Sequence, residues 1–262
     1  MASKSNLLSK MNWARCGYKN YFCFMLKRKI HIPLFFSALI ILFAFTSFSP
    51  VEKLSMNLIS KALQNGKSIT TKAEVYYKVS GSLLITHIIA PVEFLVITND
   101  KGEFKMYNIK DNTVSQAQAA DFSSENSFIH DFLNGNTNDM GLKKMGFQLK
   151  NTKVEDDMVI TSWIPPLDMS SKMSRAELVS ENYLPIYMAF YGKKEKLLSK
   201  IFYYNYQKTG ELNIPLTITE FQYLPNGDSA ITKRNYSDIK LNEEVDQKWF
   251  NYKIPDNAKI VK

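Results

Sequence analysis

The strongest constraint on the fold is a series of short segments in which apolar and polar residues alternate, separated by brief turns. The alternation begins near Glu74 and continues to Gln118, with turns at Asp100-Lys101-Gly102 and Lys110-Asp111-Asn112. Residues that alternate in this way point to opposite faces of a β-sheet. Parallel strands need a connection of about a dozen residues or more, so strands this close in sequence must be antiparallel neighbours.

Strand patterns return after residue 146, and Pro225-Asn226-Gly227-Asp228 is the clearest hairpin turn of the chain. The sequence predicts about 11 or 12 strands in all, and open twisted sheets of that size tend to curl. We therefore expect a mainly β fold, an incomplete antiparallel β-barrel. These 11 or 12 strands are drawn from thirteen segments with a strand pattern, residues 75–79, 82–90, 92–98, 103–109, 113–118, 147–153, 158–163, 175–180, 186–191, 200–206, 216–224, 229–241 and 249–254.

Helices are predicted in three places, as lids or covers for this sheet. Residues 51–64 place Leu54, Leu58 and Ala62 on one helical face, and Asn65-Gly66 then ends the segment. Ser123-Ser124-Glu125 is typical of a helix start, and Gly135 of a helix end. Between them Phe128, Ile129, Phe132 and Leu133 cluster on one side of the predicted helix. A short third helix is expected over residues 138–145.

The first 49 residues carry the signature of a secretory signal. Lys27-Arg28-Lys29 precedes an apolar run that ends near Phe48, and small residues follow where a peptidase could cut. The alternative is an uncleaved membrane anchor, because residues 30–48 are long enough to span a bilayer. Met25 stands just before the basic triplet and is a natural start. We expect a leader and signal peptide over residues 1–49 and one domain over residues 50–262.

This division also assigns the excess charge and the cysteines to the leader. Seven of the 33 basic residues and none of the 25 acidic residues lie in residues 1–49, which leaves residues 50–262 with 26 basic and 25 acidic residues. The domain is therefore close to neutral, and its composition does not predict a nucleic-acid surface. Both cysteines, Cys16 and Cys23, lie in the leader, so disulfides and thiolate sites are excluded from the domain.

The domain offers little for catalysis, metal binding or cofactors. It has two histidines, His87 in a strand-like run and His130 in the predicted lid helix, and no serine stands in a nucleophile-elbow motif. No His, Asp and Glu cluster has the spacing of metal ligands. Gly66-Lys67-Ser68 lacks the earlier glycine of a phosphate-binding loop and is interpreted as a helix end. We expect a protein that is not an enzyme and holds neither metal nor cofactor.

Several motifs, taken in order, resemble a known family. They are Gly81-Ser82-Leu83 leading to Pro91, the run 103–108, the lid region 127–133, and closing segments 236–242 and 250–255 that end at Pro255. In this order the chain resembles the periplasmic lipoprotein carriers of the LolA/LolB-like family over essentially all of residues 51–262. That resemblance implies an incomplete antiparallel barrel, covered by helices, that carries the acyl chains of lipoproteins.

The resemblance also implies a role and a location. The expected function is a periplasmic carrier that shields lipoprotein acyl chains during transfer toward the outer membrane. Its partners would be an inner-membrane donor and an outer-membrane acceptor. No cysteine follows the apolar run, which favours a soluble carrier over a lipid-anchored receptor. One departure concerns the position before the hairpin proline, where the carriers have a lid-tethering arginine and this chain has Ala90.

Transfer would work by burial of acyl chains, at about 0.8 kcal/mol for each methylene. Alternate residues of a strand point to opposite faces of the sheet, and the pattern leaves open which of these two sets faces the interior. The candidate lipid-lining residues are Leu83, Ile85, Phe94, Val96, Phe104, Met106, Phe128 and Phe132. The alternative function is an interaction or sensor module of the cell envelope on the same fold, without lipid transfer. The polar loop of residues 165–174 is its support in the sequence.

Overall fold

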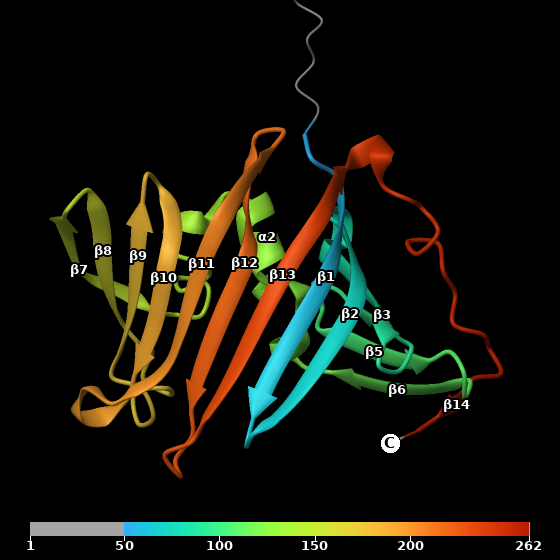
Figure 1. Ribbon diagram of the computed structural model, residues 1–262, viewed down its shortest axis with the longest axis horizontal. Coiled ribbons are helices and arrows are strands. Elements are labelled where there is room, and N and C mark those ends of the chain that lie inside the picture. Colours follow the sequence, from blue (N-terminus) through green and yellow to red (C-terminus); the bar gives the residue numbers. More distant parts are fainter. Residues whose placement is uncertain (1–49, 262) are drawn as a thin grey trace, which may run out of the picture. The chain divides into compact units, whose positions relative to one another are not determined.

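The computed structural model describes residues 50–261, which form one large curved sheet of 14 strands (Figure 1). All strand pairs are antiparallel except the short pair β14–β6. The order across the sheet is β14-β6-β5-β4-β3-β2-β1-β13-β12-β11-β10-β9-β8-β7. The strands are β1 (Lys53–Gln64), β2 (Lys67–Lys78), β3 (Leu83–Ala90), β4 (Phe94–Thr98), β5 (Glu103–Asn108), β6 (Thr113–Gln118), β7 (Gln148–Glu155), β8 (Met158–Ile164), β9 (Arg175–Glu181), β10 (Leu184–Tyr191), β11 (Leu197–Thr209), β12 (Leu212–Tyr223), β13 (Ser229–Leu241) and β14 (Lys259–Ile260).

Two antiparallel meanders make up the sheet, and a long-range pair joins them. Strands β1–β6 form the first and β7–β13 the second, and β1 pairs with β13 from Leu54↔Leu241 to Leu63↔Ile231. The predicted antiparallel order within each meander is confirmed. The end strands β7 and β14 do not pair with each other in the part of the chain that the structure describes, so the sheet is not closed into a barrel.

The predicted helix over residues 51–64 is wrong, because this segment is strand β1. It forms a regular ladder with β2 from Lys53↔Lys78 to Gln64↔Lys67. Asn65 and Gly66 have φ of 50° and 71°, which is the left-handed conformation of a two-residue hairpin turn. Leu54 and Leu58 fit both a helical period and alternation, whereas the buried Met56 fits only alternation. In Gly66-Lys67-Ser68, Gly66 accordingly completes the hairpin turn and Lys67 and Ser68 begin β2, so this segment is not a helix end.

Four further predictions need correction. The last predicted strand, residues 249–254, is irregular, and the final strand is β14, which pairs with β6. The expected helix over residues 138–145 is a series of turns. Residues 50–261 contain one α-helix, α2 (Phe128–Leu133), and several 3-10 turns, so several lid α-helices are not present there. The sheet also has 14 strands where about a dozen were expected.

Both faces of the sheet carry a hydrophobic cluster. We call the face beneath residues 119–147 the covered face; its cluster includes Leu54, Tyr77 and Tyr203. The opposite, outer face has a second cluster around Ile85 and Leu95, covered by Val245 and Trp249 of the C-terminal segment. The expectation that the strands near Leu83 and Leu84 are covered on both faces is confirmed, because Leu83 packs on the outer cluster and Leu84 on the covered one.

Residues 50–261 therefore contain a complete sheet with its own hydrophobic clusters. No helix within them has the length and hydropathy that crossing a bilayer requires. The predicted signal or anchor in residues 1–49 lies outside the described residues.

Candidate functional site

The connection between the two meanders, residues 119–147, crosses the covered face; we call it the lid segment. It contains the 3-10 turns η2 (Ala120–Phe122), η3 (Ser124–Asn126) and η4 (Asn136–Asn138) and the helix α2. Ser127 caps α2, since its side chain accepts a hydrogen bond from the backbone N–H of His130. Ser123 caps the preceding turn instead. Gly135 follows the helix with φ of 69°, as expected for a helix end.

A cavity of about 360 Å³ lies between the lid segment and the covered face. Its volume falls within the range of small-molecule sites. Strands β10 to β13 contribute one wall, and the lid contributes the other with Asn126, Ser127, Phe128, Asp131, Met140 and Met145. The strand residues that line the cavity are Met188, Phe190, Ile201, Tyr203, Ile218, Arg234 and Tyr236. Methionine side chains are flexible and adapt to apolar guests of irregular shape, so this lining suits an apolar ligand.

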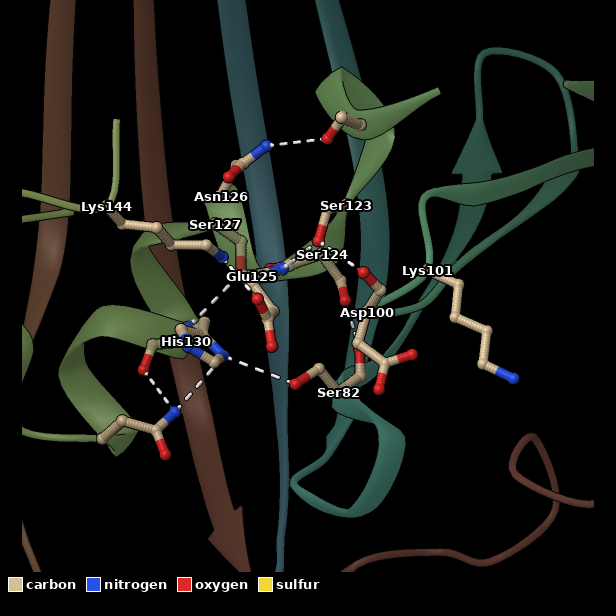
Figure 2. A network of polar contacts seen from close by, with 12 residues as sticks. Ser82, Asp100, Lys101, Ser123, Ser124, Glu125, Asn126, Ser127, His130 and Lys144 are labelled. Carbon is tan, nitrogen blue, oxygen red and sulfur yellow. Dashed lines mark hydrogen bonds and ion pairs between the residues drawn. The ribbon is translucent and has the colours of Figure 1, made fainter. Parts of the chain in front are cut away.

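One polar contact connects the helix of the lid to the sheet. The hydroxyl of Tyr77 lies 2.9 Å from Nδ1 of His130. The Ser82 hydroxyl lies 3.5 Å from the same atom (Figure 2). Burial lowers the pKa of His130, so the ring is neutral at neutral pH. Burial raises the pKa of Tyr77, which keeps its hydroxyl as a donor. We infer that the Tyr77 O–H donates to the unprotonated Nδ1 of His130.

A second set of contacts holds the start of the lid segment. The Ser124 hydroxyl donates to the backbone oxygen of Ser82, and the Ser123 hydroxyl donates to the backbone oxygen of Asp100 at 3.1 Å (Figure 2). Lys144 forms an ion pair with Glu125 across the lid. The lid is thus tied to the β2–β3 and β4–β5 turns by a few hydrogen bonds, in addition to its apolar contacts.

Asp131 is the unusual group of the cavity wall. It is 6% exposed and is the buried carboxylate of the lid helix. Burial raises its pKa to about 7, and the charge of nearby Asp139 adds to the increase. On the facing wall, Arg234 forms an ion pair with Glu220 at 3.2 Å. Below neutral pH the Asp131 carboxyl on the lid side of the cavity is therefore mainly protonated and uncharged.

The structure does not bring the eight predicted lining residues together. Phe128 lines the cavity, and Phe132 packs beside it against Tyr203 and Tyr206. Four more of the predicted residues lie on the covered face, namely Phe94, Val96, Phe104 and Met106. Leu84 packs on the covered face and stands opposite Thr98, so Thr98, Val96 and Phe94 of β4 face the same way. Their partners in β5, Phe104 opposite Thr98 and Met106 opposite Val96, share that face. These four residues belong to β4 and β5, several strands from the cavity. There the ring of Phe104 packs against Phe122 of the lid, with ring centroids 5.1 Å apart. Leu83 and Ile85 lie on the outer face.

The residues that sequence reasoning missed come from β10 to β13. Met188, Ile201 and Ile218 alternate with outer-face residues along their strands, and that alternation was visible in the sequence. What the sequence did not reveal is that the lid segment, which follows β6, crosses to these strands. The two histidines do not gather a metal site, and residues 50–261 contain no group of three or more His, Cys, Asp or Glu suited to a metal ion.

Replacement of Tyr77 by Phe should loosen the lid while it keeps the ring in the core. Loss of the hydrogen bond to His130 should cost about 1 kcal/mol. Amide hydrogen exchange in α2 should then become about fivefold faster, as measured by mass spectrometry of the peptide that contains residues 128–134. Tyr107→Phe is the matched control, since it removes a hydroxyl bonded to Asn112 at 3.0 Å beneath the outer cluster. Equal acceleration in both variants would show that the Tyr77 contact does not hold the lid.

Comparison with known proteins gives a fold but no close relative. No protein-family model matches the chain, and no curated protein matches it in sequence. A DUF1329 family protein from Desulfovibrio piger is 16% identical, with a TM-score of 0.52 over 77% of this chain and 90% of that one. A LolA superfamily protein from Nitrosomonas europaea is 16% identical, with a TM-score of 0.52 over 78% and 92%. A candidate outer membrane lipoprotein-sorting domain from Vibrio parahaemolyticus is 15% identical, with a TM-score of 0.53 over 76% and 89%.

These structures share the fold of residues 50–261. The resemblance noted in the sequence is confirmed at the level of the fold, because a LolA superfamily protein and a lipoprotein-sorting domain are similar to this chain in structure.

Proposed function

We propose that this protein is a carrier that holds acyl chains of a lipid or lipoprotein in the cavity beneath the lid segment. The observation that carries the proposal is the cavity of about 360 Å³ with its methionine and aromatic lining. Burial of eight methylenes there would contribute about 6 kcal/mol. Ile129, Phe132 and Leu142 of the lid are buried in the hydrophobic cluster of the covered face, so lifting the whole lid would expose them to water. A chain would instead enter by a smaller displacement around Phe128 and Met145, which line the cavity and are partly exposed.

The finer parts of the proposal follow from the fold that the chain shares with LolA-like proteins. We propose that the protein works in the periplasm and passes its cargo from an inner-membrane donor to an outer-membrane acceptor. The arginine that tethers the lid in those carriers is Ala90 here. We assign the tether in this chain to the pair Tyr77 and His130, which connects the lid helix to β2.

The proposal makes the protein a binder and not an enzyme. His130 is engaged by Tyr77, and the Ser82 hydroxyl 3.5 Å from it belongs to a residue that is only 6% exposed, too buried to attack a substrate. His87 lies between Glu74 and Glu93 and stacks against Trp249 with ring centroids 4.3 Å apart. An esterase panel assayed with the parent and His130→Ala would reveal an activity that this proposal excludes.

The direct test is lipid binding by residues 50–262. We expect lipid to be extracted from protein purified without detergent, and a long-chain fluorescent fatty acid to bind with an affinity that depends on the cavity. Ile201→Trp should fill the cavity and weaken that affinity about tenfold or more. Ile160→Trp, on the outer face of β8, is the matched control and should bind as the parent does. Unchanged affinity in Ile201→Trp would contradict the proposal.

An interaction module is the second candidate function. Leu167 and Met169 of the loop of residues 165–174 are 92% and 37% exposed, and Ile164 just before it is 44% exposed, so this loop presents several apolar side chains to solvent. On this alternative the loop binds another protein and the cavity stays empty. Protein that carries no extractable lipid and binds no fatty acid would favour it.

A further inference from the structure

The outer face of β10 to β12 carries an aromatic patch directly behind the cavity. The same strands alternate, so Ile201, Tyr203 and Ile218 face the cavity while Phe202, Tyr204 and Thr219 face outward. Tyr187 and Phe221 complete a concavity of about 660 Å³ that opens to solvent. The rings pack on one another: the ring centroid of Phe202 lies 5.2 Å from that of Tyr187 and 6.0 Å from that of Phe221.

Three lysines border this patch. Nζ of Lys200 lies 4.9 Å from the centroid of Phe221 and 5.5 Å from that of Phe202. Nζ of Lys233 lies 5.8 Å from the centroid of Tyr204. Lys61 of β1 stands directly opposite Lys233 in the β1–β13 ladder, so both project from the same face. Ile59 and Leu63, on either side of Lys61 on that face, are 42% and 43% exposed.

This arrangement of charge is unfavourable for the isolated domain. Like charges directly opposite each other in an antiparallel pair destabilise the sheet. The other cross-strand neighbours of these lysines are Thr70, Thr219, Ala189 and Phe221, none of which is acidic. None of the three lysines forms an ion pair with another residue of the described chain. An external anion would relieve the repulsion.

The geometry points to the surface of a bilayer that contains anionic lipids as the occupant of this face. Aromatic side chains favour the interface between headgroups and acyl chains, and each lysine near an anionic membrane is attracted to it. Strands β11, β12 and β13 are paired on both sides, so they offer no free backbone hydrogen bonds to an extended acidic peptide. This face presents aromatic rings and lysine ammonium groups, which suit a layer of anionic phosphate headgroups.

This surface is separate from the cavity and does not depend on the cargo. It would bring the carrier to a membrane, with the lid segment on the opposite side of the sheet. Membrane adsorption and acyl-chain binding can therefore succeed or fail independently in experiments.

Sedimentation with lipid vesicles tests the inference. Residues 50–262 should pellet with vesicles of phosphatidylcholine and phosphatidylglycerol at low salt, but not with phosphatidylcholine alone, and binding should fall as salt screens the charges. The combined variant Lys61→Gln, Lys200→Gln and Lys233→Gln should lose about a hundredfold in vesicle affinity. Its unfolding midpoint should not fall, because the substitution removes the Lys61–Lys233 repulsion.

The control carries the same change in net charge elsewhere. Lys101→Gln, Lys110→Gln and Lys150→Gln replace exposed lysines of a turn region and of β7, and this combination should bind vesicles as the parent does. Ile201→Trp, with its cavity filled, should also keep vesicle binding. Equal loss in both triple variants, equal binding to uncharged vesicles, or pelleting without vesicles would overturn the inference.

Discussion

Replacement of Gly102 by Ala should destabilise the protein by about 3–5 kcal/mol and release the lid segment. Gly102 has φ of 70°, and a Cβ built there would lie 2.1 Å from the backbone oxygen of Ala119. Because the clashing atom belongs to the backbone, the contact cannot be relieved by rotation of a side chain. Ala119 also donates its N–H to the Gly102 oxygen at 3.1 Å, so its displacement breaks the bond that ends the β5–β6 pair.

The lid segment begins at the residue that this clash displaces. Its next anchors, the Ser124 N–H on the Asn99 oxygen and the Ser123 hydroxyl on the Asp100 oxygen, lie in the same turn as Gly102. We expect urea denaturation to show the loss of stability. Limited proteolysis under native conditions should show cleavage within residues 119–147 before the rest of the domain is digested.

Gly66→Ala is the matched control for Gly102→Ala. Gly66 has nearly the same φ, 71°, and a Cβ there would meet nothing within 4 Å. It should cost only the backbone strain of about 1–2 kcal/mol and leave the lid resistant to protease. If the two variants lost equal stability, the close approach of Ala119 to Gly102 would not affect the free energy of unfolding. The proposed coupling of this turn to the lid would then be wrong.

The sequence predicted the strands that end in recognisable turns. Asp100-Lys101-Gly102 and Pro225-Asn226-Gly227-Asp228 do connect antiparallel neighbours. Strand β1 was mistaken for a helix because Leu54, Leu58 and Ala62 satisfy a helical spacing as well as alternation. The segment is a strand and not a helix because it pairs with β2 on one side and β13 on the other, and so joins the two meanders. No local pattern contains that information.

The site was harder to predict than the fold for the same reason. The amphipathic pattern of the lid helix correctly indicated that Phe128 and Phe132 face the sheet, although only Phe128 lines the cavity. Leu83 and Ile85 were assigned to the cavity although they lie on the outer face, since a shift of one residue exchanges the two faces of a strand. Met188, Ile201 and Ile218 reach the cavity only through the long connection from β6 to β7, whose path over the sheet has no signal in sequence.

Asp131→Asn should stabilise the protein more at alkaline than at acidic pH. The ordinary carboxyl pKa of 3.8 is raised to about 7 in the folded protein, chiefly by burial. Between these values the folded state holds a proton that the unfolded state has lost, so stability falls as pH rises through this window and stays low above about 7. Asparagine does not ionise and escapes this penalty.

The stability gain from Asp131→Asn should therefore be larger at about pH 8 than at about pH 5. About two pH units of the range between the unfolded and folded pKa of Asp131 lie above pH 5. The stability gain at pH 8 should therefore exceed that at pH 5 by about 2–3 kcal/mol. Urea denaturation of both proteins at the two pH values gives this difference directly. His130 acts in the opposite direction, because its lowered pKa makes folding less favourable as pH falls below its usual value of 6.5. Where these two pH ranges overlap, the two effects on stability oppose each other and partly cancel.

Asp139→Asn provides the control, because the Asp139 charge contributes to the raised pKa of Asp131. Its removal should lower the pKa of Asp131 and move the pH midpoint of the stability loss downward, without abolishing the loss. Carbon NMR of the Asp131 carboxyl would report the same shift at the group itself. A stability gain from Asp131→Asn that is equal at both pH values would mean that Asp131 is ionised in the folded protein. The cavity would then present a fixed negative charge on its lid side, which an apolar chain would not enter without a compensating cation.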